Sequence, residues 1–242
     1  MSTNVKSKIR IIPQAVQIPH LCTPLAQPEV SFEADEKPHT PRSHVFFLPA
    51  SIRAVKDPLY LVQAFKTWHQ SYPHLGVTLR IAGAPLDSKM VAKLKRECGP
   101  GVEYVGLLTR EQTIGEMRRC AAVINSSVSE GMSGVILEAM ALGKSPVIVR
   151  AIEGNLDIVS HNKTGYTYKT PKKFLAIAKA IVEYRNTPTS EAKRKTVDER
   201  SGVEIAPPQE VIENAVKVVR SEHSTEKEAT EYRSVVAELI SS

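Results

Sequence analysis

The chain has 242 residues, of which 42% are hydrophobic and 24% charged, values typical of a globular protein with its own core. The net charge is +6, but aromatic residues make up only 5%, which argues against a stacking surface for nucleic acid. The three cysteines are scattered and form no C-x-x-C pair, so neither a disulfide framework nor a zinc site is predicted. No apolar run approaches the ~18 residues of a transmembrane segment, and no secretory signal is recognised, so a cytoplasmic location is expected.

From residue 44 onward, segments typical of strands alternate with segments typical of helices. Strands are expected at 44–50, 77–83, 102–106, 121–127, 146–149 and 164–168. Helices are expected at 57–72, 86–98, 109–120, 133–143 and 171–184. Asp57 is expected to cap the first helix, and Thr109 to open a capping box in the third. This regular alternation predicts one Rossmann-like α/β domain over residues 44–185, with a doubly wound parallel sheet.

The two ends of the chain have a different character. Residues 8–16, "KIRIIPQAV", read as a single strand with no partner nearby in the sequence. Residues 16–43 are rich in proline and lack periodicity, which is typical of a linker or irregular arm. Residues 186–208 form a polar insert, and C-terminal helices are expected at 209–219 and 227–240.

Two glutamates flank a turn between the strand at 121–127 and the next helix. Glu130 falls in the turn, while Glu138 lies about one turn inside a helix that starts near Ser133 or Gly134. The unpaired N–H groups and the dipole of such a helix start form a natural phosphate site. A carboxylate can accept hydrogen bonds from two neighbouring hydroxyl groups. Two carboxylates on either side of a phosphate site therefore fit a nucleotide-sugar, which has hydroxyls at both ends and phosphates between them. Taken alone, the spacing is explained slightly better by an ordinary strand–turn–helix, with one glutamate exposed to solvent and the other present because it favours a helix.

Polar residues follow two other expected strands at the same edge of the sheet. Arg53 and Lys56 come after the first strand, and two cations beside helix starts fit a diphosphate. Glu153 and Asn155 come after the strand at 146–149, where they could contact a sugar or a phosphate. For Arg53 and Lys56 the alternative is a solvated basic loop. For Glu153 and Asn155 it is a turn whose residues suit its backbone geometry, and this alternative is preferred for Glu153.

Other nucleotide, metal and nucleophile patterns fail. The "GKS" at 143–145 lacks the preceding glycine of a phosphate-binding loop, since Glu138 stands there, and it ends a helix. No G-x-G-x-x-G fingerprint occurs. The seven histidines form neither a clustered metal site nor a recognisable catalytic triad. No metal and no cofactor are therefore expected.

Taken together, residues 44–185 resemble the C-terminal, donor-binding domain of the group 1 (family 4) retaining glycosyltransferases of GT-B fold. The resemblance rests on "IRAVKDPLYLVQAF", "LRIAGAP", "VEYVGLLTREQ" and above all "SEGMSGVILEAMALGKSPV". The last segment carries the two glutamates at E-x7-E spacing. The resemblance implies a hexosyltransferase-type enzyme that moves a sugar, with retention, from a UDP- or GDP-linked donor to an unknown acceptor.

The resemblance also implies roles for individual residues. Arg53 and Lys56 match the pair that contacts the donor diphosphate, and with Glu130, which matches the acid beside the donor sugar, they are the expected catalytic residues. Glu138 matches the acid that holds the ribose hydroxyls. The loop whose backbone meets the phosphates and the sugar matches Met132, Ser133, Gly134 and Val135. Cations and helix dipoles, and no bound metal, would stabilise the leaving nucleoside diphosphate.

The chain departs from the family in its N-terminal part. Enzymes of this fold have two Rossmann-like domains, whereas only one is predicted here. Residues 1–15 resemble the last strand of a missing N-terminal acceptor domain, so a truncated form with little activity alone is expected, and a partner chain could replace the missing domain. Two alternatives stay open: a catalytically silent nucleotide-sugar-binding or regulatory module, and a GT-B-type nucleotide-sugar epimerase.

Overall fold

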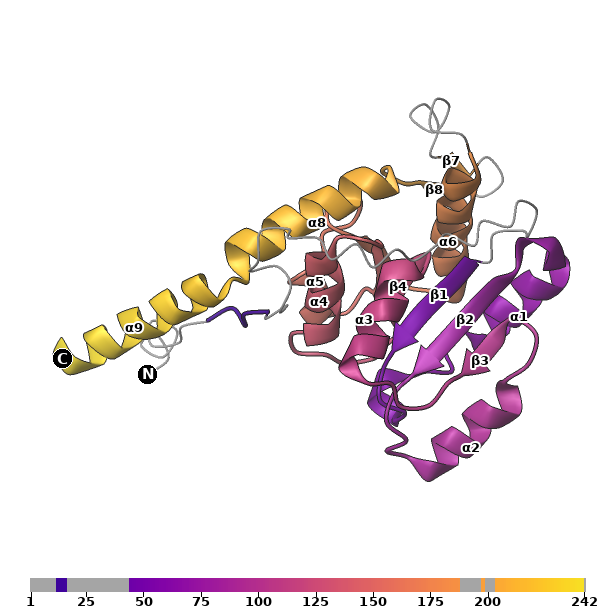
Figure 1. Cartoon of the computed structure of the whole chain (residues 1–242), viewed down its shortest axis with the longest axis horizontal. Coiled ribbons are helices and arrows are strands. Elements are labelled where there is room, and N and C mark those ends of the chain that lie inside the picture. Colours follow the sequence, from indigo (N-terminus) through magenta and orange to yellow (C-terminus); the bar gives the residue numbers. More distant parts are fainter. Residues whose placement is uncertain (1–11, 17–43, 188–196, 199–202, 242) are drawn as a thin grey trace, which may run out of the picture.

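A six-stranded parallel sheet forms the centre of the computed structural model, which describes residues 12–16, 44–187, 197–198 and 203–241 (Figure 1). The strand order is β3-β2-β1-β4-β5-β6, and all five pairings are parallel. The strands are β1 (His44–Pro49), β2 (Val77–Ala82), β3 (Val102–Tyr104), β4 (Ala122–Asn125), β5 (Val147–Arg150) and β6 (Tyr166–Tyr168). The predicted α/β fold with a doubly wound parallel sheet is confirmed.

Helices cover both faces of the sheet. The first face carries α1 (Val62–Ser71), α2 (Ser88–Glu97) and α6 (Pro171–Asn186), whose buried side chains share one cluster. The second face carries α3 (Arg110–Arg119), α4 (Gly134–Leu142) and α8 (Pro208–Glu222), which share another. Shorter elements are η2 (Ala54–Lys56), η3 (Pro73–Leu75), α5 (Glu153–Leu156) and the antiparallel pair β7 (Val197–Asp198) and β8 (Val203–Glu204). The last helix, α9 (Thr225–Ser241), extends away from the sheet (Figure 1).

The aromatic centre of the first cluster surrounds Phe46 on β1. Its ring lies 5.4 Å from Phe65, 5.7 Å from Trp68 and 6.3 Å from Phe174, measured between centroids. These residues come from the central strand and from two helices, and all are buried. The next residue, Phe47, points to the opposite face and joins the second cluster. The strand therefore ties both layers of helices to the sheet.

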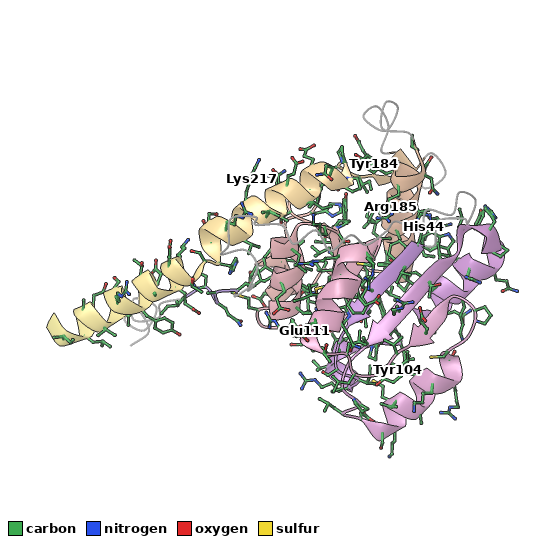
Figure 2. The ribbon with its side chains drawn as sticks, viewed as in Figure 1. His44, Tyr104, Glu111, Tyr184, Arg185 and Lys217 are labelled. Carbon is green, nitrogen blue, oxygen red and sulfur yellow. The ribbon has the colours of Figure 1, made fainter. Side chains whose placement is uncertain are left out.

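The two ends of the strands are easily distinguished (Figure 2). Glu111, in the first turn of α3, lies at the edge where the strands end. His44, the first residue of β1, lies at the opposite edge with Arg185 of α6. In doubly wound sheets ligands bind outside the carboxyl ends of the strands, so a ligand site is expected at the edge that carries Glu111.

Several local expectations proved wrong. Asp57 does not cap α1, which begins later with Leu61 at its N-cap. Asp57 adopts a left-handed conformation (φ 43°), and its carboxylate accepts a hydrogen bond from Arg150 Nη1 at 2.9 Å. Residues 12–16 form no strand, and residues 8–11 and 17–43 lie outside the described residues. Within the predicted polar insert, the short pair β7 and β8 was not anticipated, because two-residue strands leave no periodic signal.

None of the helices in the described part of the chain is long and apolar enough to cross a membrane.

Phe46 offers a test of the central packing. Replacing it with Ala removes a fully buried ring that three other aromatic rings contact. We expect the free energy of unfolding to fall by about 3–5 kcal/mol in urea denaturation. Leu86→Ala is the control, because Leu86 is 63% exposed and its loss should cost less than about 0.5 kcal/mol. Similar losses for both variants would contradict the assigned core.

Candidate functional site

The turns that follow β1 and β4 meet where the strand order reverses. The chain leaves β1 toward β2 on one side and β4 toward β5 on the other, and in doubly wound sheets ligands bind in the crevice at such a switch point. Two hydrogen bonds tie these turns together. The Val128 N–H donates to the Val55 carbonyl at 2.9 Å, and the Ser126 hydroxyl donates to the Lys56 carbonyl at 2.9 Å. The relative position of the turns is thereby fixed.

Lys56 and Glu130 form an ion pair where the two turns meet. Lys56 Nζ donates to both carboxylate oxygens of Glu130, at 2.6 and 2.7 Å. The side chains are 19% and 11% exposed, so the pair is partly shielded from water. Asn125, the last residue of β4, adds a long contact from Nδ2 to Glu130 Oε1 at 3.4 Å. Two of the residues predicted for the donor site are therefore in direct contact.

Hydrogen bonds between buried side-chain amides hold the turn that carries Glu130. Asn155, in α5, is fully buried, and its Nδ2 donates to Asn125 Oδ1 at 3.1 Å and to the Arg150 carbonyl at 2.9 Å. Asn125 Oδ1 also accepts from the Ser127 N–H at 3.0 Å. Asn155 thus holds the end of β4 and the turn that carries Glu130. Its direct contact with a donor stays a prediction.

Gly154 allows α5 to pack directly against the turn of Glu130. A Cβ atom at this position would lie 2.0 Å from the Gly131 carbonyl oxygen and 2.1 Å from the Glu130 carbonyl oxygen. Any larger residue would push the turn away, so glycine is required for close approach and not for an unusual φ. The neighbouring Glu153 is exposed and belongs to the first turn of α5, in keeping with its preferred structural interpretation.

Two aromatic residues and Arg150 complete the base of the site. The Tyr168 hydroxyl donates to the Asn125 carbonyl at 3.0 Å, and burial raises the pKa of this phenol, so it remains a donor. Arg150 Nη1 donates to Asp57 Oδ2 at 2.9 Å and to the Ser126 carbonyl at 3.1 Å. The guanidinium also stacks 3.9 Å above the ring of Tyr60. Sequence reasoning missed these contacts because they join residues far apart in the chain.

The N-terminus of α4 carries the predicted phosphate loop. The helix begins at Gly134 with Ser133 at its N-cap, as predicted, and in the described part of the chain no side chain caps it. The Ser133 carbonyl accepts from the N–H groups of Ile136 and Leu137, each at 3.1 Å. Met132 and Val135 pack against the second cluster, which orients the loop. The first backbone N–H groups of the helix are suited to an anion.

Glu138 and Arg53, the two remaining charged residues predicted for the site, lie on α4 and at the N-cap of η2. Glu138 forms an ion pair with Arg110, with 3.0 Å between Oε1 and Nη2. Arg53 is exposed at the N-cap of η2, and no carboxylate among the described residues pairs with it. Arg110 was not predicted as a site residue. Its position could have indicated it, because it opens the helix after β3 and so lies at the same sheet edge as Arg53.

Among the described residues, no group of three or more His, Cys, Asp or Glu side chains could hold a metal ion. The polar groups of the crevice are instead two lysine or arginine side chains near η2, two glutamates and a helix N-terminus. These groups suit a ligand that carries both phosphates and hydroxyls.

Several solved structures resemble this fold, among them one of a glycosyltransferase. Anabaena Alr3699/HepE in complex with UDP superposes with a TM-score of 0.63 at 16% identity, over 81% of this chain and 49% of that one. Its complex with UDP-glucose gives 0.62, also at 16% identity and with the same coverage. A glycosyltransferase from Rickettsia africae gives 0.65 at 15% identity, over 82% of this chain and 48% of that one. At these identities the likeness establishes the fold alone, that of one Rossmann-like half of a GT-B structure.

Sequence comparisons identify the family of the chain. "Glycosyltransferase 1 domain-containing protein 1" of Xenopus tropicalis is 31% identical over 245 residues, which span 98% of this chain and 62% of that protein. The chain therefore covers less than two thirds of this relative's length. Residues 43–186 match the family model for group 1 glycosyl transferases, and this segment contains the sheet with all the crevice residues named above. The chain belongs to the group 1 glycosyltransferase family.

Proposed function

We propose that this chain binds the nucleotide-sugar donor of a retaining, hexosyltransferase-type glycosyl transfer. The observation that carries the proposal is the contact of Lys56 with Glu130 beside the uncapped N-terminus of α4. A cation and a helix N-terminus suit the diphosphate, and a carboxylate suits the sugar hydroxyls. Support comes from the family and from structures of the same fold, which include complexes with UDP and with UDP-glucose. A UDP-linked donor is therefore the first to test.

In this proposal the charged groups act on the leaving nucleoside diphosphate. Glycosyl transfer breaks the bond between the anomeric carbon and the diphosphate, so negative charge develops on the phosphate oxygens. Arg53, Lys56 and the first N–H groups of α4 stabilise that charge without a metal ion. Glu138 accepts hydrogen bonds from the ribose hydroxyls. The loop of Met132, Ser133, Gly134 and Val135 contacts the phosphates and the sugar.

The ion pair of the crevice has a consequence for binding. In this proposal Lys56 turns from Glu130 toward the diphosphate when the donor binds, because the two anions compete for the three N–H donors of one ammonium group. Glu130 is then free to accept from hydroxyls of the donor sugar.

A thermal-shift panel tests the proposal. The full chain is heated with UDP-glucose, GDP-glucose or ADP-glucose at roughly 100 times an expected micromolar Kd. One donor should stabilise the fold by about 2.7 kcal/mol, which corresponds to a rise in Tm of roughly 5–10 °C. Binding without hydrolysis or transfer would favour the silent binding module. No stabilisation by any donor would contradict the proposal.

Glu130→Gln tests the competition for Lys56. The variant removes the carboxylate that holds Lys56 and lies near the phosphate site, so UDP should bind roughly 3- to 10-fold tighter by calorimetry. Hydrolysis or transfer of the sugar from UDP-glucose should fall, because the neutral amide is a weaker acceptor for sugar hydroxyls. Glu153→Gln, on an exposed neighbouring residue, is the matched control. Weaker UDP binding by Glu130→Gln would argue against the competition.

Glu138→Ala tests the ribose role. The side chain is 25% exposed and pairs with Arg110, so its loss should leave the fold intact, with Tm changed by less than about 3 °C. UDP affinity should fall about tenfold, since hydrogen bonds from ribose hydroxyls to a charged acceptor are lost. Glu213→Ala, on the exposed face of α8, should leave UDP affinity unchanged. Equal affinities for the two variants would remove Glu138 from the site.

A further inference from the structure

A short N-terminal segment, residues 12–16, lies beside the corner where α8 meets α9 (Figure 1). Three hydrogen bonds fix it there. The Val16 N–H donates to the His223 carbonyl at 3.0 Å, and the Ala15 N–H donates to Glu228 Oε1 at 3.2 Å. His223 Nδ1 lies 3.0 Å from the Gln14 carbonyl. A carbonyl only accepts, so Nδ1 carries the proton of this bond.

Within this segment, Val16 is anchored by packing, whereas Gln14 is exposed. Val16 packs against the second cluster, next to the helices of that face. His223 is buried, so its bond to the Gln14 carbonyl is shielded from water. The Gln14 side chain, in contrast, is exposed. The backbone of Gln14 is therefore held while its side-chain amide remains available to a ligand.

The segment forms one wall of a cavity of about 280 Å³ at the start of α4. Gly134, Glu138 and Arg110 line the opposite wall, and these groups belong to the candidate donor site. Gln14 Nε2 lies 3.9 Å from the position that a Cβ on Gly134 would occupy. The amide nitrogen is thus close to the first residue of α4.

Charges around the cavity indicate which part of a ligand Gln14 would meet. Glu138 is engaged by Arg110, and Glu228 accepts from the Ala15 N–H. Arg110 balances the charge of Glu138, whereas the neutral Ala15 N–H leaves the charge of Glu228 at the side of the cavity where the segment is anchored. Gln14 and Gly134, the first residue of α4, both line the cavity, and the amide –NH₂ and the first N–H groups of a helix are donors that favour an anion.

We propose that Gln14 is a donor-contacting residue whose side-chain amide adds a hydrogen bond to the phosphate held at the N-terminus of α4, and that His223 is the positioning residue that holds Gln14 there. This inference rests on the proposed function. It gives the C-terminal corner a role in binding, although that corner lies outside residues 43–186, which match the family model. The ligand is the diphosphate part of a nucleotide-sugar.

Substitutions at Gln14 test the contact in the full chain, with UDP, GDP and ADP as probes in titration calorimetry. Gln14→Ala should weaken the tightest of the three about tenfold, the usual loss for a hydrogen bond to a charged group. Gln14→Glu should weaken it further, roughly 100-fold, because like charges then face each other. Gln70→Glu, on the exposed end of α1 at the opposite sheet edge, should change nothing.

A double-mutant cycle tests the positioning role of His223. His223→Leu should weaken nucleotide binding several-fold in the wild-type background but have little effect in Gln14→Ala, since the group it positions is then gone. His223→Asn should restore binding, because the Asn amide N–H occupies the place of Nδ1–H. A purely structural role would lower affinity equally in both backgrounds. If His223→Leu fails to fold, His223→Asn and the Gln14 variants still decide the contact.

The outcomes separate the two proposals. If the wild-type chain binds none of UDP, GDP and ADP, the proposed function is overturned, and this inference with it. If the wild-type chain binds a nucleotide and Gln14→Glu binds it equally well, only the contact of Gln14 is overturned. If the Gln14 variants lose affinity while His223→Leu acts equally in both backgrounds, the positioning role alone is overturned.

Discussion

Parallel pairing of β1 with β4 is the constraint on which the rest of the site depends. The register places Phe46 beside Ala122 and Phe47 beside Val123. Two strands far apart in the chain therefore end side by side. The helices that follow lie on opposite faces of the sheet, so the two turns meet at the switch point where ligands of such sheets bind. Any other partner for β1 at this point would carry Lys56 away from Glu130.

Aromatic packing is what makes this pairing firm. Phe46 and Phe47 point to opposite faces, and each is fully buried in a different cluster. A slip of one residue would exchange the two rings and bring both faces out of register. The position of Lys56 therefore depends on the cores on both sides of β1.

A second layer of polar groups then sets the position of Glu130. Asn125, Asn155 and Tyr168 come from three neighbouring strands or the turns after them, and they bond to one another or to the turn backbone. Such buried networks resist opening, because breaking one bond leaves a polar group without water; Asn155 Oδ1 alone of these side-chain atoms has no partner among the described residues. Close contact at Gly154 adds a steric limit. Glu130 is held by this layer, whereas Glu138 is held by its place on a helix.

The sequence by itself determined the alternation of strands and helices, the start of α4 at Ser133 and Gly134, and the placement of Arg53, Lys56 and Glu130 at one sheet edge. These follow from hydrophobic period, helix-start signals and the topology of parallel sheets, all of which are local or general. Only the tertiary structure decided that Asp57 pairs with Arg150, that Arg110 pairs with Glu138, and that Asn155 is buried. It alone also brought Gln14 to His223, 209 residues away in the chain. Contacts of this kind join single side chains across the fold, and no periodic pattern records them, because each depends on how separate elements pack.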